Sequence, residues 1–345
     1  MDSRNASLFG TADFMSVPMR EFGQDAIDIH GNNRPLQEAW MNEAGFRSQS
    51  WIMRAAVSWS PSRIRPRLVR LDPRSSRFAT VLKAQITSFR PTILYNHDPS
   101  EISADLLREL MPSDCVLVGQ IASPRNPATN WQAYDLLISS LPNFVTAFRK
   151  EGLKAEYLPL AFEPRVSRSI PNSGNDIPLS FVGSLSPAHR ERLTFLETVA
   201  DNVDLAVWGD GVDRLSAESP LRKGHHGGAW GPAMFDILRR SQLTLNRHID
   251  VSENYANNMR LFEATGMGAC LVTDWKENLA DLFEPGKEVV TYRSTEECID
   301  LVRYFSRHDA EREKIAMAGQ ARCHNEHNYE KRMGELLALL ERAFD

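Results

Sequence analysis

Histidines and arginines in the second half of the chain are the first candidates for chemistry. Gly183 and Ser184 follow an apolar run, and His189, Arg190 and Arg192 come a few residues later. A glycine lets a phosphate approach the backbone closely, and cationic side chains would balance its negative charge. The segment therefore predicts an anion site. The alternative is that the two arginines lie on a solvated helix face.

A second polar group stands at the end of another apolar run. The run Leu243–Asn246 is followed directly by Arg247 and His248. A residue at the carboxyl end of a buried strand opens toward a ligand in α/β folds, so His248 could contact a phosphate or a sugar. The alternative is a hydrogen-bonded histidine at a strand end.

The histidine and cysteine spacing does not predict a metal. His225 and His226 lack a third ligand in their neighbourhood, so zinc is not expected there. The cysteines are scattered, and none forms a C-x-x-C pair. They are Cys115, Cys270, Cys298 and Cys323. We expect no metal site and no cofactor.

The composition excludes several classes of protein. Apolar residues make up 42% and charged residues 25%, as in an ordinary folded domain. The net charge of −5 argues against a dedicated nucleic-acid binder. No apolar run approaches the ~20 residues that span a bilayer, and Met1–Asn5 opens no signal segment, so we expect a cytoplasmic protein. The arginine-rich stretch 60–78 reads as a solvated connection, or as a surface for an anionic acceptor or a membrane face.

Short apolar runs alternate with helical patterns, which predicts parallel sheets with crossover helices. The strands expected in the first half are Ala26–His30, Thr92–Asn96, Cys115–Ile121, Tyr134–Ser139 and Ala155–Pro159. Those expected in the second half are Leu179–Gly183, Leu205–Gly209, Leu243–Asn246, Ala269–Thr273 and Glu288–Tyr292. The expected helices include Arg34–Ala44, Arg77–Ser88, Ser103–Leu110 and Ala188–Ala200, and a capping box at Ser294 opens another.

The chain length of 345 residues suggests more than one hydrophobic core. Arg168–Asp176 is polar, with proline and glycine, and reads as a linker. We therefore expect an N-terminal domain over 1–167, a linker over 168–176, a C-terminal domain over 177–327 and a final helix over 328–345 that braces the N-terminal domain. The first helix would begin near Thr11, so the usual first strand is absent or lies upstream of Met1.

The most informative segment runs from Asn257 to Asp274, Asn-Asn-Met-Arg-Leu-Phe-Glu-Ala-Thr-Gly-Met-Gly-Ala-Cys-Leu-Val-Thr-Asp. It resembles the donor-site helix and following strand of GT-B glycosyltransferases, and most closely the CgeB-like or "glycosyl transferases group 1" branch. The similarity covers most of the chain and is looser before residue 90. Further segments that carry it are Gly119–Ser123, Phe181–Ser186, Leu282–Val290, Ile315–Gly319, His327–Tyr329 and Arg332.

This resemblance implies two doubly wound, Rossmann-like domains that face each other across a cleft, with a nucleotide-sugar donor on the C-terminal one. Glu263 would accept hydrogen bonds from both ribose hydroxyls, because two vicinal donors match two carboxylate oxygens. The helix start at Asn257, Asn258, Met259 and Arg260 would face the diphosphate, where unpaired amides favour negative charge. The alternative for Glu263 is a surface carboxylate paired with an arginine.

Other positions follow the family pattern less closely. The branch often has Asn-x-His where this chain has Asn246 and His248, and Trp230 stands in the loop that borders the nucleobase. Trp230 would shield the base or serve as a hydrophobic anchor. Many retaining members carry a second glutamate eight residues before Glu263, and this chain has Tyr255 there. The stereochemical outcome of transfer is therefore open.

On the acceptor side, the resemblance implies a base that deprotonates a hydroxyl. His97 and Asp98 follow an expected strand, and Asp13 stands near the N-terminus. Each is a candidate catalytic base. Asn-His-Asp-Pro is also an ordinary turn sequence.

These features predict metal-independent transfer of a sugar from a nucleoside diphosphate, with UDP preferred. The acceptor would be a saccharide, a lipid-linked molecule, a small molecule or a protein, with no nucleic acid and at most peripheral membrane contact. Two alternatives stay open: an epimerase or hydrolase acting on the same donor, and a non-catalytic scaffold that binds a nucleotide or a partner.

Overall fold

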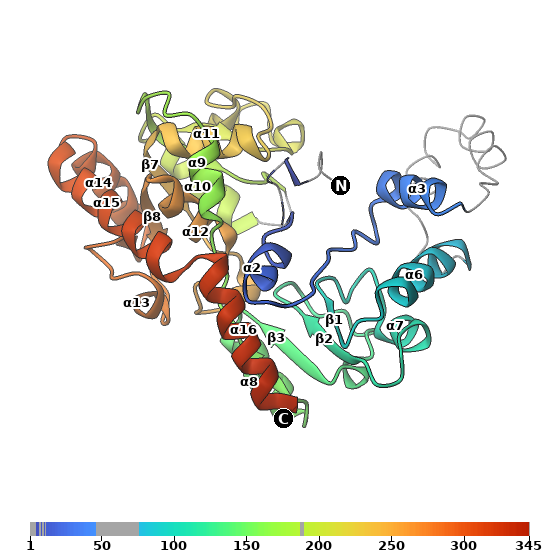
Figure 1. Ribbon diagram of the computed structural model, residues 1–345. Helices are drawn as coiled ribbons and strands as arrows, with labels where there is room; N and C mark the ends of the chain where they lie inside the picture. Colours follow the sequence, from blue (N-terminus) through green and yellow to red (C-terminus); the bar gives the residue numbers. More distant parts are fainter. Residues whose placement is uncertain are drawn as a thin grey trace, which may run out of the picture. The chain divides into compact units, whose positions relative to one another are not determined.

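The computed structural model describes residues 5–6, 8, 10, 12–45, 76–186 and 190–344. Contacts divide the chain, drawn in Figure 1, into two compact units. One consists of Ile27–Ser139 and Phe144–Tyr157; the other consists of Asp2–Ala26, Ser140–Asn143 and Leu158–Asp345. Most of the arginine-rich stretch, Thr11 and His189 lie outside the described residues.

The first unit is built around a parallel sheet with strand order β1-β2-β3-β4. Its strands are β1 (Ile93–Asn96), β2 (Val116–Gln120), β3 (Leu136–Ser139) and β4 (Ala155–Tyr157). Every residue of β3 is buried, as expected of a continuous apolar run covered on both faces. The helices in this part of the chain are α3 (Arg34–Glu43), α6 (Ser76–Phe89), α7 (Ala104–Leu110), η1 (Trp131–Ala133) and α8 (Pro142–Lys150).

The strand expected at Ala26–His30 is not formed, and that prediction is wrong. The segment is irregular, and Ile27 is 49% exposed. The Arg20 guanidinium donates to the carbonyl of Ala26, which occupies a group that a sheet ladder would need. Asp25 and Asp28 on either side of Ile27 also favour solvent over a core.

The second unit contains a five-stranded parallel sheet with the order β6-β5-β7-β8-β9. Its strands are β5 (Ile177–Val182), β6 (Ala206–Trp208), β7 (Ser241–Asn246), β8 (Cys270–Asp274) and β9 (Val290–Tyr292). The chain moves from β5 to β6 in one direction and then returns past β5 to β7. Right-handed crossovers therefore place α10 (Arg190–Ala200) and α11 (Pro232–Arg240) on opposite faces of the sheet.

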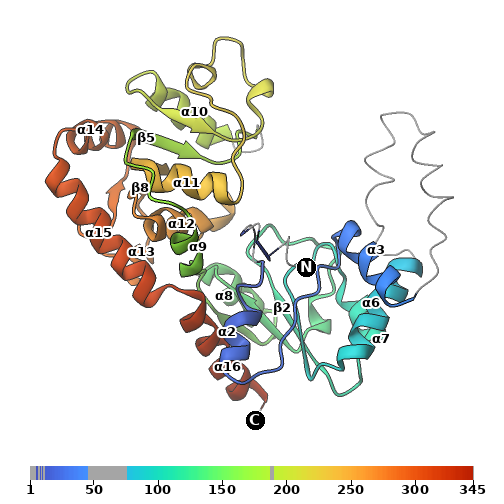
Figure 2. The ribbon, with the colours of Figure 1, turned by 45° about the horizontal axis from the view of Figure 1, so that its top comes forward.

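The remaining helices cover both faces of this sheet (Figure 2). They are α12 (Met259–Met267), α13 (Leu279–Leu282), α14 (Thr295–Phe305), α15 (Asp309–Glu326) and the short helices α9 (Pro164–Ser169), η3 (Val212–Arg214), η4 (Pro220–Arg222) and η5 (Asp250–Ser252). Ser294 caps α14 by accepting from the Glu297 amide at 3.2 Å. The Glu297 carboxylate accepts from the Arg293 amide at 2.7 Å, one residue before the cap, so only half of the expected capping box forms.

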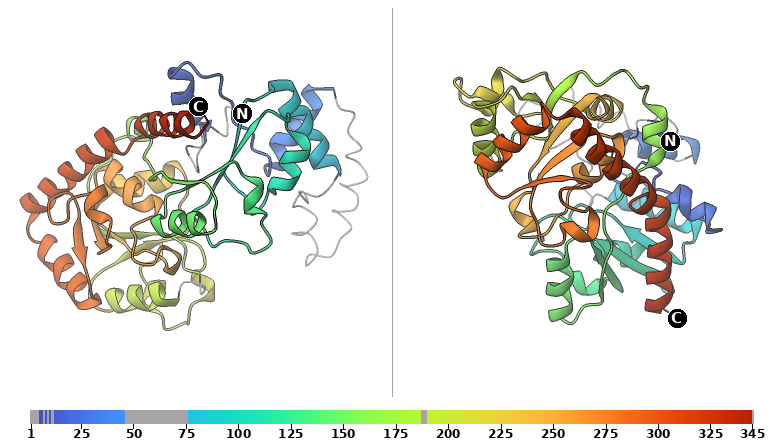
Figure 3. Two further views of the ribbon diagram at one scale, coloured as in Figure 1. Left: turned by 90° about the horizontal axis from the view of Figure 1, so that it is seen from below. Right: turned by 90° about the vertical axis from the view of Figure 1, so that its left-hand side faces the viewer.

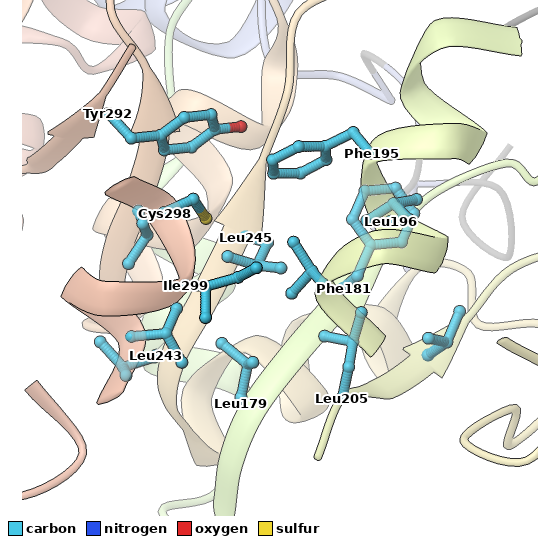
Figure 4. Packing of buried hydrophobic residues seen from close by; sticks show 14 of the residues in the cluster. Leu179, Phe181, Phe195, Leu196, Leu205, Leu243, Leu245, Tyr292, Cys298 and Ile299 are labelled. Carbon is cyan, nitrogen blue, oxygen red and sulfur yellow. The ribbon is translucent and has the colours of Figure 1, made fainter. Parts of the chain in front are cut away.

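The core between the sheet and α10 and α14 holds the site's scaffold in place. Phe195 stacks on Tyr292 with ring centroids 5.2 Å apart, and Leu243 and Leu245 pack beneath them (Figure 4). Leu243 and Leu245 alternate along β7 with Thr244, whose hydroxyl accepts a hydrogen bond from Ser180 on the neighbouring strand. This alternation fixes which face each residue presents and therefore the register at the carboxyl ends of the strands.

The C-terminal helices contact the N-terminal segment of the same unit. α15 ends at Glu326 and α16 (Tyr329–Phe344) follows after a bend, visible in Figure 3. At this bend, Phe162 donates its amide to the His327 carbonyl and accepts the Tyr329 amide. α16 packs against α2 (Ser16–Glu21) in the same unit. Residues Asp2–Ala26 therefore group with the C-terminal half, whereas the sequence suggested one N-terminal domain over 1–167.

The segment expected as a linker is attached to the second unit. Asp176 forms a two-point ion pair with Arg240 on α11, and Ser173 donates to Asp236. Among the described residues, no helix is long and apolar enough to cross a membrane.

Candidate functional site

The site lies at the carboxyl edge of the second sheet, where the strand order reverses between β5 and β7. In open α/β sheets, ligands bind at such a switch point because the flanking loops diverge there. Gly183 follows β5, and Arg247 and His248 follow β7. The residues that the sequence predicts as anion and sugar contacts therefore lie at one edge of the sheet.

The turn after β5 is held by close backbone packing. Gly183 donates its amide to the Trp208 carbonyl at 2.9 Å. A Cβ on Gly209 would lie 1.8 Å from the Gly183 carbonyl oxygen, so only glycine fits beside this turn. The Ser184 hydroxyl accepts the Ser186 amide at 3.2 Å. The backbone of the turn is thus anchored to the end of β6 and the residue after it.

Helix α12, which lies within the segment Asn257–Asp274, is positioned by hydrogen bonds between side-chain amides. Asn258 caps α12 by accepting from the Leu261 amide at 3.1 Å. Its Nδ2 donates to Asn246 Oδ1 at 2.7 Å, and Asn246 donates in turn to Thr273 Oγ1 at 2.9 Å. Asn246 is 3% exposed, so it lies where it supports Asn258. The first amides of α12 lack intrahelical partners, which suits an anion.

Glu263 lies one turn into α12 beside Arg260. Its Oε2 is 2.9 Å from Arg260 Nη1, and each side chain is only 14% exposed. Arg260 also donates from Nε to the Val182 carbonyl at the end of β5, at 3.1 Å. Burial raises the pKa of Glu263, and the nearby Arg260 charge opposes that rise. Glu263 therefore has the arginine partner expected by the alternative interpretation. That interpretation also expects a surface carboxylate, whereas the Glu263 side chain is largely buried.

His248 forms a buried pair with Asp274 at the end of the neighbouring strand β8. The Asp274 Oδ1 accepts from His248 Nδ1 at 2.7 Å and from the His248 amide at 3.0 Å. Burial acts to raise the pKa of Asp274, but the hydrogen bond and charge of His248 outweigh it and hold that pKa below its ordinary value. The expectation of a hydrogen-bonded histidine at a strand end is therefore met, with a carboxylate as its partner.

A pocket of about 350 Å³ opens beside this pair. It is lined by residues from the loops after β7 and β8 and from the first turn of α10. Arg192, Arg247, His248 and Lys276 give it several cationic or titratable groups.

Comparisons with known proteins agree with this architecture. A family model described as "Glycosyl transferase-like" matches residues 190–338. Sucrose-phosphate synthase from Thermosynechococcus elongatus superposes with a TM-score of 0.56 at 12% identity, covering 78% of this chain and 77% of that one. Anabaena Alr3699/HepE in complex with UDP-glucose gives 0.56 at 12% identity, covering 77% and 82%. AviGT4, a glycosyltransferase involved in avilamycin A biosynthesis, gives 0.53 at 17% identity, covering 77% and 78%.

The chain has the GT-B fold. No curated protein matches it. The expected α/β class is confirmed.

Within the GT-B fold, several predicted donor residues differ in exposure. Met259 and Asn257 are half-buried at the start of α12, and Arg190 is exposed at the start of α10. Trp230 is 54% exposed in the loop before α11, where a plain hydrophobic anchor would be buried. His189 lies outside the described residues. None of these side chains is tested as a ligand contact, so their roles stay predictions.

The candidate bases lie in different parts of this GT-B chain. His97 and Asp98 follow β1 in the first unit, and Asp98 Oδ1 accepts the Glu101 amide, as in an ordinary turn. Asp13 belongs to the second unit, where it receives Arg165 Nη2 at 2.9 Å. Both carboxylates form structural contacts, and the ring of His97 lies 4.9 Å from that of Tyr95.

Sequence reasoning missed Asp274, Lys276 and the importance of Arg247. The usable signal was their position directly after adjacent parallel strands, because the carboxyl ends of β7 and β8 converge. Among the described residues, no three His, Cys, Asp or Glu side chains gather as a metal site.

Proposed function

We propose that this chain transfers a sugar from a nucleoside-diphosphate sugar to an acceptor hydroxyl. The observation that carries the proposal is Glu263, a carboxylate held at the switch point by Arg260 and aligned by a capped α12. Its two oxygens suit the vicinal hydroxyls of ribose, and the first turn of α12 suits the diphosphate.

UDP is our preferred nucleotide, and a saccharide is our preferred acceptor. Solved GT-B neighbours support both choices, since HepE is described with UDP and glucose and the pneumococcal O-GlcNAc transferase GtfA with UDP and GlcNAc. Membership of the CgeB-like branch and a cytoplasmic location are also part of the proposal, on the sequence alone.

The chemistry assigned to these residues is electrostatic. As the bond from the sugar to the diphosphate breaks, negative charge grows on the leaving phosphate. Unpaired amides of α12 and the Arg190 guanidinium would stabilise that charge without a metal ion.

Among the three candidate bases, we propose His97 as the group that deprotonates the acceptor, because burial lowers its pKa to about 4 and a neutral imidazole can accept a proton at pH 7. His97→Gln should lower kcat by about 10²–10⁴-fold. Asp98→Asn serves as the comparison and should have a smaller effect, measured as initial rates at saturating donor. Equal losses in both variants, or none in His97→Gln, would contradict this choice.

The experiment for the whole proposal measures donor turnover. The chain is incubated with UDP-glucose, UDP-N-acetylglucosamine, GDP-mannose or dTDP-glucose and a panel of mono- and oligosaccharides. Release of nucleoside diphosphate and the mass of the product are recorded. We expect acceptor-dependent release with one donor, reduced at least tenfold in Glu263→Ala. Release without any acceptor product would instead favour a hydrolase, and nucleotide binding without release would favour a scaffold.

A further inference from the structure

The pocket beside His248 contains two guanidinium groups that have no carboxylate partner among the described residues. Arg192 lies with its Cζ 5.9 Å from the centre of the Phe181 ring, and Arg247 lies 4.8 Å from that of Phe195. Arg192 donates from Nη2 to the Ser184 carbonyl at 2.7 Å, while its buried Nε finds no acceptor in the described part of the chain. We call this cavity the Arg192–Arg247 pocket.

The carboxylates that also line the pocket do not neutralise these arginines. Asp274 is engaged by His248 at 2.7 Å and by Lys276 at 3.5 Å. Glu191 and Glu253 are exposed to solvent, where water screens their charge. Among the described residues, Arg192 and Arg247 are therefore the pocket cations without an ion-pair partner. Desolvation already lowers the pKa of Arg192, so a bound anion would relieve a cost that the empty pocket carries.

His248 provides a second, independent sign of a ligand. Its side chain is fully buried, and its Nδ1 is taken by Asp274. Its Nε2 has no hydrogen-bond partner among the residues that the structure describes. Buried polar atoms in folded proteins usually have a hydrogen-bond partner, which can be water or a ligand.

The position of the pocket indicates which part of a donor would reach it; this step rests on the proposed function. Glu263 lies inside α12, on the α11 side of the sheet, and would hold the ribose. The first turn of α12 would hold the diphosphate. The Arg192–Arg247 pocket is lined by the start of α10, on the opposite side of the sheet, and by the loops after β7 and β8. Ribose, diphosphate and sugar follow in this order along a donor, so the sugar falls at the pocket.

We propose that the Arg192–Arg247 pocket binds a sugar that itself carries a carboxylate, so that the donor is a nucleoside-diphosphate hexuronate. A planar guanidinium matches a carboxylate with two parallel hydrogen bonds, which a neutral hydroxymethyl group cannot form.

The test compares matched donors that differ only at this group. Binding of UDP, UDP-glucose and UDP-glucuronate is measured by titration calorimetry on the full chain; if only guanosine nucleotides bind, GDP-mannose and GDP-mannuronate replace them. We expect the hexuronate to bind at least tenfold more tightly than the hexose. In Arg247→Gln this preference should fall below about threefold while the affinity for the nucleotide alone is kept, which also shows that the variant is folded.

Two further variants complete the design. Arg247→Lys should retain part of the preference, since it keeps the charge but not the planar donors. Arg307→Gln removes an exposed arginine at the end of α14 and should keep the full preference. Equal affinity for hexose and hexuronate, with the nucleotide still bound, would overturn the acidic-sugar inference alone. A preference that survives in both Arg247→Gln and Arg192→Gln would also overturn it. Binding of no nucleotide would overturn this inference together with the proposed function.

Discussion

At the scale of a single residue, Glu263 has a proposed role in nucleotide binding and an unfavourable effect on stability. The carboxylate is largely buried, and Arg260 is the one cation that pairs with it among the described residues. Burial outweighs that cation, because the pKa of Glu263 is raised above its ordinary value. A raised carboxyl pKa means that the folded chain binds a proton more readily than the unfolded chain. The free energy of unfolding therefore falls as pH rises above about 4.5, through the shifted range.

Glu263→Gln should separate the effect of this carboxylate on stability from its effect on nucleotide binding. The amide can still accept from Arg260 but carries no charge to desolvate, so the variant should melt about 1–3 °C higher than the native chain at pH 7.5. The difference should shrink at pH 5, where the native carboxyl is more protonated. The same variant should bind nucleotide at least tenfold more weakly. Thermal melts at both pH values and nucleotide titrations check this, and a variant that is less stable yet binds normally would contradict it.

At the residue scale, the sequence located helix starts and strand ends, and the ligand contacts assigned to these residues stay predictions. Glu263, Asn258 and His248 each stand in a short segment whose neighbours identify a helix start or a strand end. The sequence could not predict the pairing of His248 with Asp274 or the placement of Arg192 beside Arg247. Those contacts join segments separated by many residues, and they depend on strand order, which spacing along the chain does not specify.

At the scale of elements, the site depends on how closely α12 packs against Phe162, in the segment just before α9. A Cβ on Gly266 would lie 2.5 Å from the ring of Phe162. Phe162 cannot withdraw easily, since its backbone is hydrogen-bonded to both His327 and Tyr329. Gly268 ends α12 in the left-handed conformation, with φ of 90°.

Gly266→Ala should therefore destabilise the chain by about 1–3 kcal/mol through overpacking. Gly334→Ala is the matched control, because it is also helical and its Cβ would lie an ordinary 3.6 Å from Phe22. That control should be neutral or stabilising by up to about 1 kcal/mol, from the better helix propensity of alanine. Urea unfolding of both variants decides the matter, and equal stabilities would count against the packing described for α12.

The strands of both sheets were predictable because parallel strands buried on both faces read as continuous apolar runs. Ala26–His30 has too few apolar residues and two nearby aspartates, so its pattern was ambiguous and the strand prediction failed. The order of the strands in each sheet could not be predicted from the sequence, although that order creates the switch point.

At the scale of the whole molecule, the chain's first residues are held by its last half. Arg165 reaches Asp13 at 2.9 Å and Glu163 at 3.1 Å, and Glu163 is only 7% exposed. The contact between Asp13 and Arg165 could not be predicted from the sequence, because it depends on the packing of α2 on α16.

Arg165→Ala should cost about 1–3 kcal/mol, because it leaves the buried Glu163 without its cation. Lys331→Ala breaks an exposed pair with Glu326, whose side chains are 50% and 46% exposed, and should cost less than about 1 kcal/mol. Chemical denaturation of both variants, with limited proteolysis near residue 25, tests the tether. If the two variants lost the same stability, the Arg165 contacts would not hold the N-terminal segment.

The central claim is that a nucleoside diphosphate binds against Glu263 on α12. The most direct measurement is titration calorimetry with UDP, GDP, dTDP and ADP on the native chain, on Glu263→Ala and on Glu313→Ala. Glu313 is an exposed carboxylate on α15 and serves as the control. We predict that one diphosphate binds the native chain and Glu313→Ala equally, and binds Glu263→Ala at least tenfold more weakly. No binding to the native chain, or binding that Glu263→Ala leaves intact, would contradict the claim.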